Sequence, residues 1–294
     1  MINIVLPSKD TVQDWAKFIS DNLDVTIGSS ITYDLKAISK LRPHHLVALA
    51  CLIEQHSPNV ERRNLLISNQ LVKTYLENIG FTDYFNREKK RPHELIPSRD
   101  KRTLNLWKLH PEMIYMYPIE AQRFYERNAF EGKDLHALNT SLSEILNNFI
   151  DHTKPSNFGF TATQLFEDQH KLETAVCDFG GGIPNKINAY FELNEMEKLS
   201  DEQALRWAMK IGNSTKSTFK NKGFGLDTLS SLVAKLNGEL RIVTNRVVLF
   251  QSGNNEFKVN SLTSSFPGTL ITVSLDTNFL RNKEEFELDS EELF

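Results

Sequence analysis

Apolar and polar positions in residues 1–80 repeat with two periods, one typical of strands and one typical of helices. Short apolar runs predict strands at 2–6, 25–33 and 64–68. Amphipathic or apolar stretches predict helices at 11–19, 44–55 and 69–78. The second of these helices follows Pro43 and is apolar enough to be buried. Alternating strands and helices predict a small α/β layer at the start of the chain.

From residue 119 onward the pattern places helices first and antiparallel strands last. Helices are expected at 119–130, 134–152, 200–208 and 226–236, and the third opens with the capping-box pair Ser200 and Gln203. Strands are expected at 158–166, 171–178, 239–244, 247–251, 256–262 and 269–275, with turns at Asn245 and 252–255. This order predicts an α+β sandwich in which one mixed sheet carries helices on one face.

The segment between these two halves is charged and contains Pro92 and Pro97, which predicts a linker or long loop. We therefore expect an α/β domain at 1–86, a linker or long loop at 87–118, a second domain at 119–276 and an acidic tail at 277–294. The tail mixes acidic and apolar residues, so we expect it to be poorly ordered or bound to a partner.

Composition limits the classes of function. The 294 residues are 40% hydrophobic and 24% charged, enough for two ordinary domains, and the net charge of −4 gives no general attraction to nucleic acid or anionic membrane. Cys51 and Cys177 lie in apolar segments and form neither a disulfide framework nor a metal site by themselves. The sequence has no apolar run of about 18 residues and no basic signal-peptide start. We expect a cytoplasmic protein that binds neither nucleic acid nor membrane.

The helix at 134–152 carries the first candidate site. Glu144, Asn148 and His152 share a stripe beside its buried face. A carboxylate and an amide one turn apart can share a hydrated Mg²⁺, which keeps several waters and takes few protein ligands. Ser141-x-x-Glu144 also has the pattern of a capping box, but apolar periodicity begins before Ser141 and makes Glu144 a mid-helix residue.

The second candidate site is Asp178 and the glycine run after it. Asp178 ends an apolar strand, and a buried carboxylate needs a donor, which the amino group of adenine can supply. Gly180 and Gly182 allow the backbone to pass close to a flat base, and Ile183 can pack on its face. The plain alternative is an ordinary turn, for which Asp-x-Gly is common.

The third candidate site is Gly223-Phe-Gly225, which opens the helix at 226–236. A glycine loop at a helix start offers free N–H groups and a positive dipole end to phosphate. Lys216 and Lys222 precede it in a polar segment, as expected for a lid that closes on a triphosphate. Ser214, Thr215 and Ser217 can add hydroxyl contacts, although an ordinary surface loop is an equal alternative for these three. The sequence contains no Walker phosphate loop, Rossmann fingerprint or zinc-spaced cluster.

In this order the three motifs resemble the nucleotide site of the GHKL superfamily, which includes gyrase-type ATPases, histidine kinases and anti-sigma-factor serine kinases. The resemblance covers about half the chain and implies a Bergerat-type fold that binds ATP and Mg²⁺. It implies that Asn148 ligates Mg²⁺ and that Glu144 acts as a general base or orients the attacking group. It also places Thr269 near Asp178 and the adenine, and His152 stands where anti-sigma-factor kinases also carry a histidine.

The first domain more weakly resembles a STAS-type domain, the fold of anti-sigma-factor antagonists, through its alternation and the stretch Leu76-Glu-Asn-Ile-Gly-Phe81. Antagonists carry a phosphorylatable Ser or Thr just before the apolar helix. The corresponding stretch here, 40–44, has no hydroxyl, so we expect the phospho-switch to be missing. We interpret His44 and His45 as an exposed or capping pair at the helix start rather than as phosphoacceptors.

Three uses of ATP stay open. The first is phosphoryl transfer by a regulatory kinase of the anti-sigma type, with a protein substrate or regulatory protein partner. The second is an ATP-hydrolysing conformational switch, whose transducer domain would have to come from a partner. The third is a non-catalytic ATP-binding sensor. A two-component sensor kinase is disfavoured because no helical hairpin with a phosphoacceptor His precedes the ATP domain. We expect kinase-like transfer, and the superfamily's frequent dimerisation leaves a homodimer open.

Overall fold

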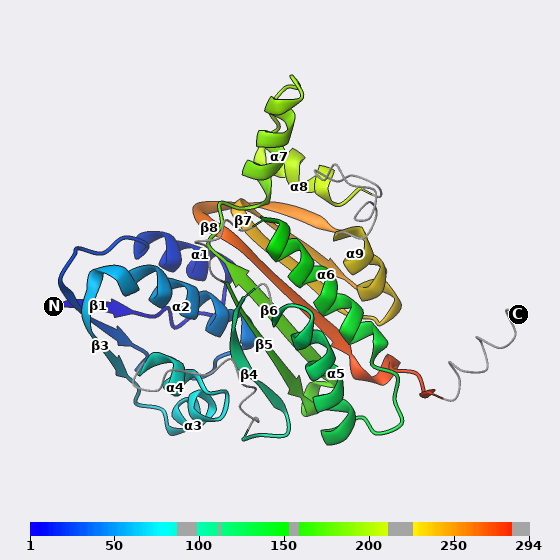
Figure 1. Ribbon diagram of the computed structural model, residues 1–294, viewed down its shortest axis with the longest axis horizontal. Helices are drawn as coiled ribbons and strands as arrows, with labels where there is room; N and C mark the ends of the chain where they lie inside the picture. Colours follow the sequence, from blue (N-terminus) through cyan, green and yellow to red (C-terminus); the bar gives the residue numbers. More distant parts are fainter. Residues whose placement is uncertain (87–98, 111–112, 153–158, 211–225, 284–294) are drawn as a thin grey trace, which may run out of the picture.

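The computed structural model describes residues 1–86, 99–110, 113–152, 159–210 and 226–283, with the backbone alone at 148–152. Its N-terminal layer is a parallel three-stranded sheet in the order β1 (Ile2–Val5), β2 (Ser29–Asp34), β3 (Val60–Leu66). The helices α1 (Val12–Asp21) and α2 (Pro43–His56) connect these strands, and α3 (Gln70–Asn78) and α4 (Phe81–Phe85) follow them (Figure 1). The predicted small α/β layer is therefore present.

Local sequence explains how the helices of this layer begin. Thr11 is the N-cap of α1, and its hydroxyl accepts the N–H of Asp14. Asn69 caps α3 in the same way. α2 starts at Pro43, where a missing N–H costs no helical hydrogen bond, and almost every residue from Leu46 to Ile53 is buried. A helix that is apolar all round belongs between two layers, and α2 lies there.

The second half of the chain forms a five-stranded sheet in the order β4-β5-β6-β8-β7. Its strands are β4 (Thr103–Leu109), β5 (Gly159–Phe166), β6 (Lys171–Asp178), β7 (Glu239–Ser252) and β8 (Lys258–Asp276). All its neighbouring pairs in the described chain run antiparallel, so the predicted mixed sheet is wrong. The short connections β5–β6 and β7–β8 require antiparallel partners. β4 lies inside 87–118, the range expected to be a linker or long loop.

The long strand β7 bends at Asn245, whose φ of 48° is left-handed. After the bend, the Gly253 N–H donates to the Gly238 carbonyl at 2.7 Å, and the Arg241 guanidinium lies 5.9 Å from the centre of the Phe250 ring. The two halves of β7 therefore fold back on each other. This confirms the turn predicted at Asn245, although the expected separate strands are parts of β7 and β8.

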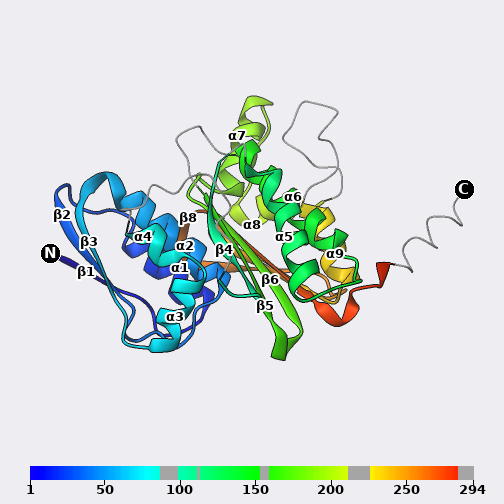
Figure 2. The same ribbon diagram turned by 60° about the horizontal axis from the view of Figure 1, so that its bottom comes forward.

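Helices cover both faces of the five-stranded sheet (Figure 2). One face carries α5 (Met116–Asn128), α6 (His136–His152) and α9 (Leu226–Lys235), and the other carries α1 and α2 of the N-terminal layer. The prediction of helices on one face is therefore incomplete. The second face has apolar side chains that need cover, among them Phe160, Ala162 and Cys177, and the N-terminal helices supply it.

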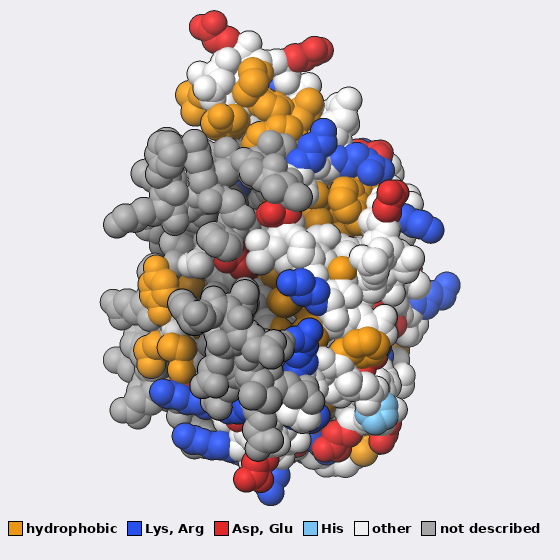
Figure 3. All heavy atoms as spheres, turned by 90° about the vertical axis from the view of Figure 1, so that its right-hand side faces the viewer, with side chains coloured by type: hydrophobic (Ala, Val, Ile, Leu, Met, Phe, Trp, Pro, Cys, Tyr) orange, Lys and Arg blue, Asp and Glu red, His pale blue; other side chains and the backbone are white. Residues whose placement is uncertain are grey.

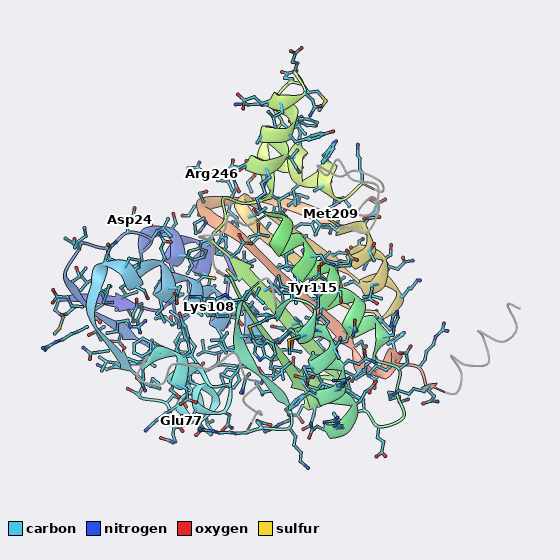
Figure 4. All side chains as sticks on the ribbon, viewed as in Figure 1. Asp24, Glu77, Lys108, Tyr115, Met209 and Arg246 are labelled. Carbon is cyan, nitrogen blue, oxygen red and sulfur yellow. The ribbon has the colours of Figure 1, made fainter. Side chains whose placement is uncertain are left out.

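Two hydrophobic cores result, one between the two sheets and one between the larger sheet and α5, α6 and α9. Lys108 on β4 joins the layers at the rim, where its Nζ lies 2.6 Å from Oε1 of Glu54 on α2 (Figure 4). Among the described residues, no helix combines the length and the apolar character needed to cross a membrane.

One end of the sheet carries a projection formed by α7 (Ile183–Leu193) and α8 (Asp201–Ala208) (Figure 1). The sequence predicts α8, and its capping box of Ser200 and Gln203 is confirmed, but it does not predict α7. Hydrophobic side chains gather on this projection (Figure 3), where Leu193 and Met196 are exposed.

Candidate functional site

Asp178 is the last residue of β6, at the end of the sheet from which α7 rises (Figure 1). Side chains alternate along a strand, so Asp178 shares the face of Leu172 and Val176, which belong to the core under α6 and α9. The β6–β8 register pairs Asp178 directly with Thr269, and both residues are buried. The structure therefore brings these two predicted site residues together.

The Asp178 carboxylate receives little stabilisation from the described residues around it. Burial raises its pKa to about 6, and the charge of Lys186 and the hydrogen bond from Gly180 oppose this rise only in part. The Gly180 N–H donates to Oδ1 at 2.7 Å, and it is the one hydrogen bond to this carboxylate from the described residues. A carboxylate has about four acceptor positions, so most of its capacity is left for a ligand.

The glycine loop after Asp178 is pressed against the bend of β7. Gly182 has φ 82° and ψ 162°, a conformation that only glycine adopts readily. A Cβ there would lie 1.9 Å from Asn245 Oδ1 and 2.6 Å from Thr244 Oγ1. Gly181 also has a positive φ, 92°, but a Cβ there would meet nothing within 4 Å. The positions that require glycine are thus Gly181 and Gly182, whereas Gly180 contributes its N–H.

Thr244 and Gly268 complete this end of the sheet. The buried Thr244 hydroxyl donates to the Gly268 carbonyl at 2.9 Å and accepts the Ile183 N–H at 3.0 Å. A Cβ on Gly268 would lie 2.0 Å from the Asp178 carbonyl oxygen, so the start of this part of β8 approaches Asp178 closely. Gly181, Thr244 and Asn245 belong to this site but were not predicted from the sequence. The only signal was the turn at Asn245.

α6 supplies Glu144, the predicted catalytic residue. The helix begins at His136, and the Ser141 hydroxyl donates to the Ala137 carbonyl at 2.8 Å, so Ser141 does not cap a helix start. Glu144 is therefore a half-buried mid-helix residue. The sequence predicts a buried stripe at Leu138, Leu142, Ile145, Leu146 and Phe149. The stripe is confirmed at the first four residues, and the side chain of Phe149 lies outside the described residues. α6 lies over β6 and β8 and beside α9, on the face to which Asp178 points.

The remaining predicted residues divide into two groups. Ile183 starts α7, is 9% exposed and packs into the core beneath α6 and α9. The side chains of Asn148 and His152 in the last part of α6 lie outside the described residues. So do Lys216, Lys222, Gly223 and Gly225.

A second polar cluster joins the N-terminal layer to the other face of β6. His44 Nδ1 lies 3.0 Å from Glu173 Oε1, and the Arg42 Nη1 donates to Glu173 Oε2 at 3.1 Å. His44 Nε2 lies 3.7 Å from Asp10 Oδ1. His45 Nδ1 accepts the Arg42 N–H, and its Nε2 lies 2.7 Å from Asp10 Oδ1. The predicted capping role is confirmed for His45. The prediction that the pair is exposed is wrong, because neither ring is exposed.

The pKa values of the two histidines shift in opposite directions. Burial alone would lower the pKa of His44, but hydrogen bonds with Asp10 and Glu173 outweigh it and raise the pKa. Burial lowers the pKa of His45 to about 4. The same network holds the pKa of Glu173 below its usual range despite burial, and hydrogen bonds with His44 and His45 lower that of Asp10. The network therefore favours the charged form of His44 and the neutral form of His45.

Donor atoms of Asp10, His44 and His45 lie within 4.8 Å of one another, which is close enough for a shared metal ion. The hydrogen bonds oppose this interpretation for His45. Its Nδ1 accepts the Arg42 N–H, so its Nε2 carries the ring proton and has no lone pair for a metal. We therefore assign these residues to a hydrogen-bonded network between layers.

No protein-family model matches the sequence, and neither a curated protein nor a solved structure matches it significantly.

Proposed function

We propose that this chain binds ATP with Mg²⁺ at the end of β6, in the manner of GHKL proteins. The observation that carries the proposal is the environment of Asp178. Its buried carboxylate accepts one hydrogen bond from the described residues and lies beside Thr269 and a glycine loop that leaves no room for a Cβ at Gly182. A flat base with an exocyclic amino group suits such an acceptor.

The arrangement of elements supports the same proposal. A long helix with Glu144 lies over the sheet face to which Asp178 points, and α9 lies beside that helix. This is the order expected of a Bergerat-type domain, although the described sheet is antiparallel rather than mixed. We assign the N-terminal layer, with its parallel strands and two crossover helices, to a STAS-like role as a regulatory module.

Glu144 and several residues whose side chains lie outside the described part of the chain complete the proposed site. Asn148 would ligate Mg²⁺, and Glu144 would act as a general base or orient the attacking group. Gly223 and Gly225, with Lys216 and Lys222, would hold the triphosphate, because glycine N–H groups and lysine charges suit phosphate. His152 would lie near the transferred group. Bound Mg²⁺ supplies charge neutralisation at the phosphates.

We propose kinase-like transfer to a regulatory protein partner in the cytoplasm as the use of this ATP. Incubation with γ-labelled ATP, with and without the products of neighbouring genes, separates the outcomes. Label on a protein supports the kinase, whereas release of free phosphate alone contradicts it and supports an ATPase switch. Tight ATP binding without turnover supports a sensor. The binding step itself is tested by titrating ATP into the protein and its Asp178→Asn variant.

A further inference from the structure

A polar cavity of about 260 Å³ lies on the face of the large sheet that is opposite to Asp178. Its floor is formed by β6, β7 and β8, and one wall is formed by Arg42 and His44 at the start of α2. On this face of the sheet, apolar residues under α2 give way to polar ones where the helix begins. A water needs about 10–15 Å³ of such space, so the cavity is large enough for a small metabolite.

Among the described residues, the charged side chains that line this cavity are paired except for one. The Arg42 guanidinium and the His44 ring engage Glu173, and Lys171 Nζ lies 2.6 Å from Glu239 Oε1. Arg241 on β7 also lines the cavity, but it forms no ion pair with any residue that the structure describes. Its guanidinium contacts the Phe250 ring, and its positive charge acts to lower the pKa of His44. Arg241 therefore leaves an uncompensated positive charge at the cavity.

The floor of the cavity also contains a hydroxyl that has no hydrogen-bond partner among the described residues. Ser274 on β8 is 4% exposed, lines the cavity, and its Oγ has no hydrogen-bond partner among the described residues. A buried hydroxyl without a partner costs free energy, so such groups in folded proteins are normally satisfied by water or a ligand. Ser274 therefore provides a donor that is independent of Arg241.

We propose that this cavity binds a small anion through a carboxylate or phosphate group, with Arg241 and the Ser274 hydroxyl as its donors. Guanidinium groups match both oxyanions in geometry and charge. The acidic residues of the cavity do not prevent this, because Glu173 is occupied by Arg42 and His44, and Asp10 is occupied by the two histidines. The site is separate from the proposed nucleotide site, because its residues face the N-terminal layer.

The test is calorimetric titration of the full chain with inorganic phosphate and, separately, with succinate, at constant ionic strength set with chloride. Saturable binding of either anion is expected, and the stronger one identifies the group. Arg241→Gln is expected to weaken this binding at least about tenfold, because a charge-assisted hydrogen bond is lost. Ser274→Ala is expected to weaken it without loss of stability, since its hydroxyl has no protein partner to lose.

Arg246→Gln is the matched control, because Arg246 lies on the same strand with an exposed side chain at the α7 end (Figure 4). It is expected to bind the anions like the wild type. The proposal is overturned if neither anion binds saturably, or if Arg241→Gln and Ser274→Ala, shown to be folded by circular dichroism, bind as the wild type does. Equal losses in Arg241→Gln and Arg246→Gln would also overturn it, because they would reveal nonspecific attraction.

Discussion

Glu173 and Asp178 lie on the same strand, β6, and their side chains leave opposite faces of the sheet. Glu173 accepts from Arg42 and faces His44 of the N-terminal layer, whereas Asp178 faces the layer of α6 and α9. The Cys51 thiol of α2 also donates to the Cys177 carbonyl at 3.3 Å, next to Asp178. One strand therefore connects the N-terminal layer with the candidate nucleotide site.

The bond between His44 and Glu173 predicts a pH-dependent stability. His44 has a raised pKa in the folded protein, so its stabilisation is complete below the unfolded value of about 6.5 and is lost as pH rises through the folded pKa. His44→Gln is expected to lower the free energy of unfolding by about 1–3 kcal/mol at pH 6 and by less at pH 9.

Urea unfolding of wild type and His44→Gln between pH 6 and pH 9 measures this difference. His136→Gln is the control, because His136 is exposed at the start of α6, and it should match the wild type at every pH. If the loss of stability in His44→Gln is constant across this pH range, the interaction of His44 with Glu173 does not depend on a charged imidazole.

The glycine loop predicts a contrast between two neighbouring substitutions. Gly181→Ala places a Cβ in open space and is expected to cost about 1–2 kcal/mol, because of its positive φ alone. Gly182→Ala adds collisions with Thr244 and Asn245 to a conformation reserved for glycine, so it is expected to cost at least about 2 kcal/mol more. Thermal or urea unfolding of both variants measures the contrast, and equal losses would contradict the close approach of this loop to β7.

Much of the fold near the site could be predicted because the signals are local. The apolar strand that ends at Asp178, the stripe of α6 and the capping box of α8 each lie within one element, and the structure reproduces them. Prediction failed where a stronger neighbouring signal competed. β4 has apolar residues typical of a strand, although Leu106-Trp107 interrupts their alternation, and the basic and proline-containing residues before it favoured a linker. α7 follows a glycine run, which favoured a turn.

Long-range relationships could not be predicted from the sequence. His44 and Glu173 are 129 positions apart, and nothing in either neighbourhood indicates the other. The buried state of His45 depends on Asp10 and on stacking against Trp15, which bring the start of α1 and the start of α2 together. The second helical cover of the large sheet has the same origin, because only tertiary packing decides where α1 and α2 lie.

Glu144 predicts a separation of binding from turnover. If it acts on the attacking group, Glu144→Ala is expected to keep ATP affinity within about threefold and to lower turnover at least about 100-fold, the usual contribution of general acid–base catalysis. Calorimetry measures the first quantity, and transfer or release of labelled phosphate measures the second. Glu131→Ala, at an exposed carboxylate after α5, is the control and should change neither. Unchanged turnover in Glu144→Ala would remove Glu144 from the mechanism.

Asp178 predicts a gain of stability on mutation. Burial raises its pKa from 3.8 to about 6, so the folded state keeps a proton that the unfolded chain has lost, and stability falls as pH rises between these values. Asp178→Asn has no charge to bury and is expected to be about 2–3 kcal/mol more stable than wild type at pH 8, with a smaller gap near pH 4.5. Urea unfolding at both pH values measures the gap. If Asp178→Asn is less stable than wild type at pH 8, the buried charge of Asp178 does not destabilise the folded protein.

Calorimetry of Mg-ATP binding at pH 8 tests whether Asp178 binds the base of ATP. Wild type should bind saturably, and Asp168→Asn, at an exposed carboxyl at the opposite end of β6, should bind equally well. Asp178→Asn should bind at least about 100-fold more weakly while remaining folded and more stable, because an amide N–H would face the amino group of adenine. Unchanged ATP affinity in Asp178→Asn, or no binding by the wild type, would show that Asp178 does not bind the base of ATP.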